Sequence, residues 1–294
     1  MDALFIGHNY TDVTFLTDYL PTGDEKHVGQ DYAFGVGGNA VVAAFTVAKL
    51  GLDAGLLTQV AEDRLGDHFL QRAARRGIRI FPRAVDRSSL SLILPNSGNK
   101  RAIVRCRDLE YSGPIPKIRL KNVQAIHVDG HMPISALEYV KKGREKGILT
   151  SLDGGTVRPG MAEILEYIDI AVVSEDYAND MKLSHEQTLA YLHEKGVKIA
   201  AVTVGDKGLL YSEGHGIKTL PALDIPMDKI IDTTGAGDVF HGAYVYSYIE
   251  NPERSWEDHF KFARCASALC IQKMGAETGI PILSDVEELY EKTK

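Results

Sequence analysis

Short apolar runs alternate with amphipathic stretches along most of the chain. The runs are too short for typical helices and are rich in Val and Ile, which is typical of buried strands. Helical stretches such as 134–146 and 186–195 separate them. This alternation predicts a parallel sheet with helices on both faces and with ligands outside the carboxyl ends of its strands. The runs are 3–6, 54–60, 123–128, 148–152, 168–173 and 199–204.

Two N-terminal regions have a different pattern, typical of partly exposed strands. Segments 89–94 and 101–106 alternate apolar and polar residues, and a Gly-containing stretch, 96–100, joins them, which predicts a hairpin. Residues 13–34 mix β-branched and aromatic residues with Pro21 and Gly23, which favours exposed strands over a core helix. The alternation places Arg101 and Arg105 on one face of the hairpin. Such arginines either form a solvated face or reach an anionic substrate group.

Composition narrows the class of protein. A hydrophobic content of 44% and a charged content of 25% over 294 residues are ordinary for a globular protein. The net charge of -7 argues against a nucleic-acid surface and favours small-molecule partners. The N-terminus lacks a basic leader, and no apolar run approaches the ~18 residues of a membrane span. Cys106, Cys265 and Cys270 are too few and too irregular for a disulfide framework or a zinc site, so we expect a cytoplasmic protein.

The most informative stretch is 232–238, Asp-Thr-Thr-Gly-Ala-Gly-Asp, which precedes a helix-like run. Small residues allow a tight turn, and a helix starting there directs unpaired N–H groups toward one point, which makes an anion site. Asp238 is unusual there because phosphate repels a carboxylate. Accepting a proton from an attacking hydroxyl would explain its presence. The alternative is that Asp238 only caps the helix.

A second motif, Gly37-Gly38-Asn39, opens the amphipathic run 41–50, which Gly51 closes. Together the two motifs resemble the signatures of the PfkB, or ribokinase-like, family of small-molecule kinases, and the resemblance spans nearly the whole chain. It implies a three-layer α/β/α fold with a mainly parallel central sheet. It also implies a single domain, 1–294, with a small β-sheet lid formed by about 13–34 and 88–107. Val42 departs from the pattern, since many members have Asn there.

The resemblance assigns roles to individual residues. Asp238 is the base, and the Gly235-Ala236-Gly237 amides, with that of Asp238, form an anion hole for the phosphoryl group. The sugar-binding residues are Asp12, Gly37, Gly38 and Asn39, and the candidates for a charged substrate group are Lys26, Arg101 and Arg105. The residues expected to contact the nucleotide are Thr203, Gly205 and Gly208 in a loop and Ala263, Ala266 and Ser267 in a helix. The candidate metal residues are Glu175 and Asp232.

Several of these assignments have plainer alternatives. Glu175 also suits a helix start, and the glycines at 205 and 208 also suit a β-turn. The stretch 174–177 departs from a family motif associated with magnesium, because Ser174 replaces an Asn and Tyr177 replaces a Glu.

The sequence therefore predicts an ATP-dependent sugar kinase that phosphorylates a hydroxyl of a ketose-type, anionic sugar, as in the fructose and sulfofructose kinases it resembles. Mg²⁺, K⁺ and a homodimer formed through the lid belong to this prediction. A nucleoside kinase of the same fold and a non-catalytic sugar- or nucleotide-binding regulator are the alternatives, the second motivated by the altered stretch 174–177.

Overall fold

A computed structural model describes residues 1–95 and 101–294, without the side chain of Arg101. The described residues form a central nine-stranded sheet in the order β13-β12-β11-β10-β9-β8-β1-β4-β5. Its pairs are parallel except β11–β12 and β12–β13, as the alternation of strands and helices predicts. The strands are β1 (Ala3–Ile6), β4 (Ala54–Ala61), β5 (Arg79–Val85), β8 (Ala125–Val128), β9 (Leu149–Gly154), β10 (Ile170–Ser174), β11 (Ile199–Thr203), β12 (Leu209–Ser212) and β13 (Lys218–Leu220).

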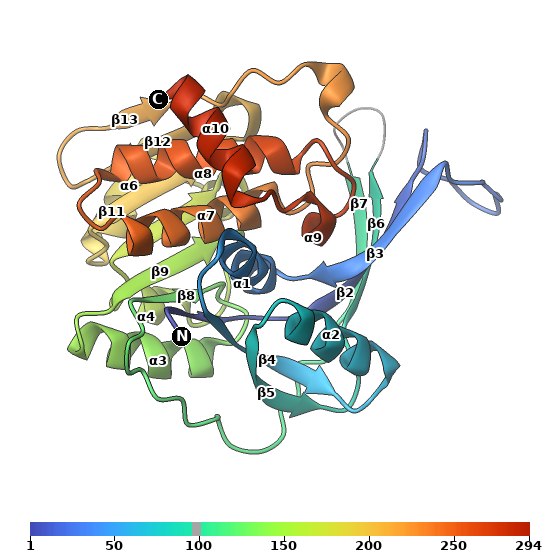
Figure 1. The fold of residues 1–294 in the computed structure, drawn as a ribbon, viewed down its shortest axis with the longest axis horizontal. Coiled ribbons are helices and arrows are strands. Elements are labelled where there is room, and N and C mark those ends of the chain that lie inside the picture. Colours follow the sequence, from blue (N-terminus) through green and yellow to red (C-terminus); the bar gives the residue numbers. More distant parts are fainter. Residues whose placement is uncertain (96–100) are drawn as a thin grey trace.

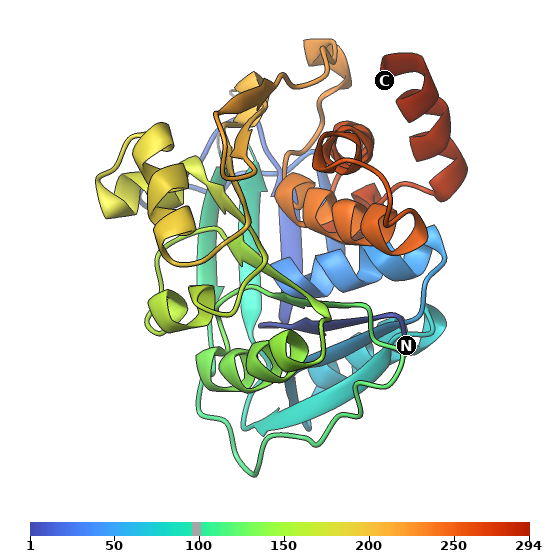
Figure 2. The ribbon, with the colours of Figure 1, turned by 90° about the vertical axis from the view of Figure 1, so that its left-hand side faces the viewer.

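Helices cover both faces of this sheet and bury two hydrophobic cores, so the fold has three layers (Figures 1 and 2). On one face lie α1 (Asn39–Leu50), α2 (Arg64–Arg75), α7 (Ala236–Glu250), α8 (Trp256–Cys270), α9 (Ala276–Gly279) and α10 (Leu283–Thr293). On the other lie α3 (Pro133–Glu145), α4 (Met161–Leu165), α5 (Glu175–Met181) and α6 (His185–Glu194). Short 3-10 turns, η1 (Gly205–Lys207) and η2 (Met227–Lys229), complete the elements.

A second sheet projects from this body at the right of Figure 1 and confirms the predicted lid. Its order is β3-β2-β6-β7. Its strands are β2 (Tyr10–Leu16), β3 (Asp31–Gly37), β6 (Leu90–Pro95) and β7 (Arg101–Cys106). The first two extend three residues beyond the predicted limits of 13 and 34. The predicted turn at 96–100 lies outside the described residues.

Residues paired in register across the lid strands point to the same face of the sheet, so each row of paired residues shows the chemistry of one face. One row across the strands reads Gly35, Asp12, Ser91 and Arg105. The adjacent row, on the opposite face, reads Phe34, Val13, Leu92 and Val104. The lid therefore has one face with polar residues around Asp12 and one apolar face.

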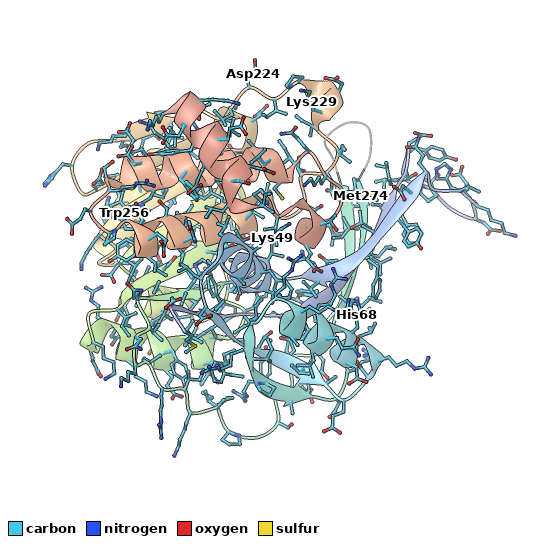
Figure 3. The ribbon with its side chains drawn as sticks, in the orientation of Figure 1. Lys49, His68, Asp224, Lys229, Trp256 and Met274 are labelled. Atoms are coloured by element: carbon cyan, nitrogen blue, oxygen red, sulfur yellow. The ribbon has the colours of Figure 1, made fainter. Side chains whose placement is uncertain are left out.

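Helices α1 and α7 pack against each other at very short range. A Cβ atom at Gly242 of α7 would lie 2.5 Å from the carbonyl oxygen of Ala43 in α1. Only glycine permits this approach of the two backbones. The C-terminal end of α1 is also fixed, because the Lys49 ammonium donates a hydrogen bond to the Ile280 carbonyl (Figure 3). The N-terminal ends of α1 and α7 thus keep a fixed relative position.

Two further sequence expectations concern the burial of cysteines and the presence of membrane-spanning helices. Cys265 and Cys270 are buried, as predicted, and burial raises the pKa of Cys270 to about 12. Within the described ranges, every helix is too short or too polar to span a membrane.

Candidate active site

The stretch 232–238 forms the predicted turn and helix start. Gly235 has φ +80°, and a Cβ atom there would lie 2.5 Å from that of Ala276, so the position requires glycine. The buried Asp232 carboxylate fixes the turn, because its Oδ1 accepts the Thr234 N–H at 2.9 Å and its Oδ2 accepts the Gly275 N–H at 2.9 Å. The turn is therefore fastened to the segment that leads into α9.

Helix α7 begins at Ala236 and places Asp238, half-buried, in its first turn. The first N–H groups of a helix point out of its N-terminus, where the helix dipole is positive. Val239 already donates to the Gly235 carbonyl at 2.8 Å, and the Ala236 N–H donates to the Thr233 carbonyl at 3.3 Å. The Ala236 amide therefore already has a backbone partner, and its role toward an anion stays a prediction. Gly237 is exposed and is the more suitable donor to an anion.

The structure brings three of the predicted sugar-binding residues together where β1 leads into the lid. A Cβ atom at Gly37 would lie 1.9 Å from Oδ2 of Asp12. One at Gly38, with φ +106°, would lie 1.9 Å from the His8 carbonyl oxygen. These glycines let the carboxylate and the backbone approach as closely as they do.

Asn39 follows them at the start of α1. Its Nδ2 donates to Oδ2 of Asp153 at 2.9 Å. Asp153 is buried near the end of β9 and also lies 3.6 Å from Nε2 of His241 on α7. Asp153 has no assigned role among the residues predicted from the sequence. Its position at the carboxyl end of a predicted strand was the available signal.

Asp12 lies on the polar face of the lid, in β2. Its pKa is raised to about 6, chiefly by burial and to a smaller extent by the Asp232 carboxylate, while the Ser91 hydroxyl and the Arg105 guanidinium oppose the shift. Arg105 shares the lid row of Asp12, is exposed, and lies 5.1 Å above the Tyr10 ring. The two residues therefore face the same region of the site.

Lys26, another cationic candidate, lies away from Asp12. Lys26 is exposed in the loop that follows Leu16, the last residue of β2. Leu16 is four residues from Asp12, or about 13 Å at 3.3 Å per strand residue, so Lys26 lies beyond the end of the hairpin. Arg101 occupies the first position of β7, and its side chain lies outside what the structure describes.

A pocket lies between the lid and the segment that leads through α9. The buried carboxylate of Glu277 accepts the Val36 N–H at 3.2 Å and pairs with Arg72 at 2.6 Å, so it joins the lid, α2 and α9. His68 of α2 adds a ring contact with Phe34 at 4.9 Å (Figure 3). Sequence analysis missed Glu277, which has no local motif. The pocket is lined by Asp12, Thr14, residues 33–36 and residues 275–278.

The predicted nucleotide loop forms where β11 ends. Thr203 is half-buried, and Gly205 and Gly208 have φ +60° and +96° on either side of η1. A Cβ atom at Gly208 would lie 2.2 Å from the Leu220 carbonyl oxygen. This loop lies beside Ser174, because Ser174 and Thr203 pair in register at the carboxyl ends of β10 and β11. The loop thus needs glycine for its backbone, as expected.

The helix residues assigned to the nucleotide require a correction. Ala263 and Ala266 are 0% exposed and belong to the core, whereas Ser267 is half-buried. A methyl group without exposed surface cannot contact a ligand unless the fold opens. Ser267 is therefore the one of the three that keeps a surface for a nucleotide.

The altered stretch 174–177 has a structural role. The Ser174 hydroxyl caps α5 by accepting the Tyr177 N–H at 3.2 Å and donates to the Gly155 carbonyl at 2.7 Å. Tyr177 is buried, and burial raises its pKa to about 12. Glu175 is exposed in the first turn of α5, with an oxygen 3.2 Å from Nε2 of His185. Glu175 and its neighbour Asp176 both present carboxylates to solvent in this stretch.

The layered fold, the lid and the two glycine turns form a framework in which a small-molecule kinase could hold phosphate groups. Residues 2–283 match the pfkB family of carbohydrate kinases, and the chain belongs to that family. It is thus an ATP-dependent carbohydrate kinase.

Relatives of known name support this assignment. The chain is 25% identical to a ribokinase of Lactococcus lactis, over 96% of this chain and 94% of the relative. It is 27% identical to an ATP-dependent ribose-1-phosphate kinase of Halopiger xanaduensis, over 94% of each chain.

Solved structures share the fold over almost the whole chain. A structure from Agrobacterium tumefaciens has a TM-score of 0.90 at 24% identity and covers 99% of this chain and 97% of its own. An Arabidopsis thaliana ribokinase complexed with ribose and ATP has a TM-score of 0.82 at 23% identity and covers 99% and 98%. At these identities the likeness shows the ribokinase fold.

Proposed function

We propose that this kinase transfers the γ-phosphoryl group of ATP to a hydroxyl of a ketose-type sugar that carries an anionic group. The observation that carries the proposal is the lid row in which Asp12 and Arg105 flank Ser91. A carboxylate that accepts sugar hydroxyls and a guanidinium that pairs with an anion then face the same ligand. The Halopiger relative, whose name gives a phosphorylated sugar as its substrate, agrees with this arrangement.

In the proposed reaction Asp238 accepts the proton of the attacking sugar hydroxyl as the oxygen bonds to the γ-phosphorus and the bond to ADP breaks. A positioned base contributes roughly 10²- to 10⁴-fold to such a step. The N–H groups at the start of α7, chiefly that of Gly237, stabilise the charge that develops on the phosphoryl oxygens. Asp12, Gly37, Gly38 and Asn39 hold the sugar, and the lid excludes water that would otherwise accept the phosphoryl group.

The proposal includes the metal ions expected from the sequence. Mg²⁺ neutralises phosphate charge in kinases and is bound through few protein carboxylates together with phosphates and water. The exposed Glu175 fits such a partial role at the end of β10. Asp232 fits less well, because each of its oxygens already accepts a backbone N–H. Its turn against Gly275 is instead our candidate region for K⁺.

A homodimer through the lid also belongs to the proposal, as does a cytoplasmic location. The apolar lid face exposes large side chains, with Tyr32 67%, Val104 61% and Phe34 43% exposed. Exposed apolar area of this kind is typical of protein–protein contacts. A second lid with the same face would cover it.

The catalytic test is Asp238→Asn. We expect turnover to fall by roughly 10²- to 10⁴-fold, because the amide cannot accept the proton, while ATP still binds. Turnover is measured as ADP release with Mg²⁺ and K⁺ against ketoses, aldoses, sugar phosphates, sulfonated sugars and nucleosides. Near-normal turnover of this variant would contradict the assigned base.

The substrate test is Arg105→Gln. We expect kcat/KM for an anionic sugar to fall about 10-fold or more, because a hydrogen bond to a charged group contributes roughly 1.5–3 kcal/mol. The neutral sugar of the same skeleton should be unaffected. Arg79→Gln, at an exposed arginine that begins β5, is the matched control. Equal losses on both sugars would refute the anion role.

A nucleoside substrate is the alternative, since the lid carries the aromatic residues Tyr32 and Phe34, although both side chains lie on the lid face opposite Asp12. Turnover of a nucleoside in the panel, with none of any sugar, would favour it. ATP binding without turnover of any substrate would favour the regulator.

A further inference from the structure

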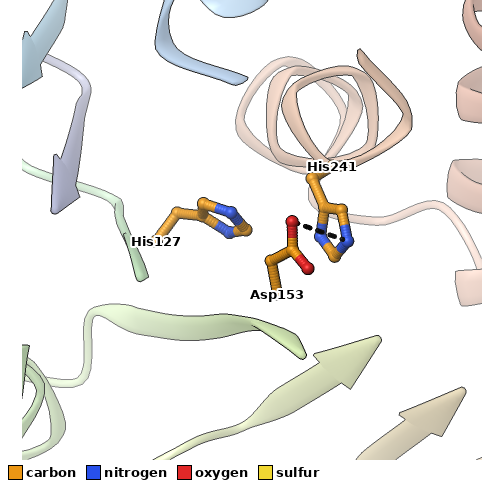
Figure 4. Close-up of side chains that lie close together, drawn as sticks. All are labelled: His127, Asp153 and His241. Carbon is orange, nitrogen blue, oxygen red and sulfur yellow. Dashed lines mark ion pairs between the residues drawn. The ribbon is translucent and has the colours of Figure 1, made fainter. Parts of the chain in front are cut away.

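Three buried side chains converge beneath the active site, and the proposed reaction uses none of them directly. They are His127 of β8, Asp153 near the end of β9 and His241 of α7 (Figure 4). One ligand atom of each lies within 4.8 Å of the other two. Each residue is at most 5% exposed.

The two imidazoles are held by hydroxyl groups through their Nδ1 atoms. His127 Nδ1 lies 2.9 Å from the Ser151 hydroxyl, and His241 Nδ1 lies 2.9 Å from the Tyr244 hydroxyl. The two hydroxyls are themselves 2.6 Å apart. When both Nδ1–H groups donate to these oxygens, both Nε2 atoms carry free lone pairs. Metal-binding histidines are oriented by this kind of outer hydrogen bond.

Among the described residues, the polar atoms of this cluster are only partly satisfied. His127 Nε2 is buried and has no hydrogen-bond partner among the described residues, which is costly for a polar atom. Asp153 is a buried carboxylate whose described partners are Asn39 and the more distant His241. A cation between the three would satisfy the nitrogen and neutralise the carboxylate.

The donor set selects the class of ion. Two imidazoles and one carboxylate are typical of zinc and related transition metals, with a fourth position left for water. Mg²⁺ and Ca²⁺ prefer oxygen ligands alone.

We propose that His127, Asp153 and His241 bind one divalent transition-metal ion of the zinc type. Metal–ligand bonds of about 2.0–2.2 Å in tetrahedral geometry require the three ligand atoms to lie about 3.4 Å from one another. The ligand side chains would therefore move by roughly 1 Å when the ion binds. The ion would connect β8, β9 and α7, and through Asp153 and Asn39 it would reach the sugar-binding turn. It thus has a positioning role and does not depend on which substrate the kinase uses.

The test uses full-length protein without a histidine tag, stripped of metal by a chelator and then titrated with Zn²⁺ or Co²⁺. We expect one tightly bound ion per chain by elemental analysis, a raised Tm, and the visible absorption of tetrahedral Co²⁺. X-ray absorption on the Zn²⁺ form should show two imidazole ligands, and this readout needs no variant.

Two variants and one control locate the ion. His127→Gln and Asp153→Asn should lose at least tenfold in affinity for Co²⁺. His259→Gln should not, because His259 is a buried histidine of α8 whose Nδ1 contacts the Ser247 hydroxyl outside the cluster. Circular dichroism and ATP binding establish that each variant is folded. The proposal is overturned if folded wild-type protein takes up neither ion, or if both cluster variants bind Co²⁺ as tightly as the control.

Discussion

The nucleotide side of the site is shaped mainly by backbone, whereas the sugar side is shaped by side chains that bond across the fold. Gly205, Gly208 and Gly235 adopt positive φ in the turns that we propose to hold phosphate groups. On the sugar side, Asn39 bonds to Asp153, which is 114 positions away. The backbone turns can serve any nucleoside triphosphate kinase of this fold. The side-chain network is where we expect substrate choice to be decided.

Placing one methyl group on each side of the site gives the strongest test of this difference. Gly37→Ala puts a Cβ atom on the Asp12 carboxylate, and Gly208→Ala puts one on the Leu220 carbonyl. We expect the first to raise KM for the sugar and the second to raise KM for ATP. Each effect should be roughly 100-fold, because displacing binding groups by about 1 Å costs that much. Steady-state kinetics with each substrate varied in turn measures both.

Gly51→Ala is the control for glycine replacement as such, since it has positive φ but no atom within 4 Å of an added Cβ. It should lose stability and leave both KM values alone. If Gly37→Ala and Gly208→Ala each raised KM for the sugar and KM for ATP to the same extent, the proposed difference between the two sides would be refuted.

Removing one polar side chain from each side should have a smaller effect. Asn39→Ala deletes the bond to the buried Asp153, so we expect about a 10-fold weaker sugar affinity and a loss of roughly 1–3 kcal/mol in stability. Thr203→Ala deletes only a 3.4 Å contact to the Val173 carbonyl and a candidate phosphate contact. Calorimetric titration of each variant with sugar and with an ATP analogue measures which of the two affinities each substitution weakens. A stability loss for Thr203→Ala as large as that for Asn39→Ala would contradict the contrast.

The smallest expected effect is on pH dependence. Because burial raises the pKa of Asp12 to about 6, its carboxylate is ionised above that pH and becomes protonated as the pH falls through it. The ionised form accepts sugar hydroxyls, so the sugar Kd should be about twofold weaker at pH 6 than at pH 8 and weaker still below. Asp12→Asn should bind sugar weakly and without this dependence. A wild-type Kd that is constant from pH 8 to pH 5 would refute the role of Asp12 ionisation.

The features predicted best from sequence are those that local chemistry determines. Alternating strands and helices gave the layered fold, and period-two patterning gave the lid, because both follow from which side chains face the core. The turns at Gly235 and Gly208 were predictable because only glycine suits their backbone. The roles of the catalytic and binding residues remain predictions, although the structure brings Asp12, Gly37 and Gly38 together.

The remaining features depend on contacts that no local pattern records. Glu277 joins the lid to α2, although it is 241 positions from Val36 and 205 from Arg72. Asp153 meets both Asn39 and His241 only in the folded chain. Helical periodicity did not separate the buried Ala263 and Ala266 from the partly exposed Ser267, since α8 packs on several sides. The separation of Lys26 from Asp12 could not be foreseen, because the length of the lid hairpin was not known in advance.

The close contact at Gly242 bears on how such a kinase acquires a new substrate. Because the backbones of α1 and α7 touch there, a larger residue at 242 would shift the sugar-binding turn relative to Asp238. Divergence of specificity is therefore expected in the lid, where a strand can change residues without moving the helix pair. Laboratory evolution for a different sugar should accumulate substitutions in β2, β6 and β7 while Gly242 stays invariant.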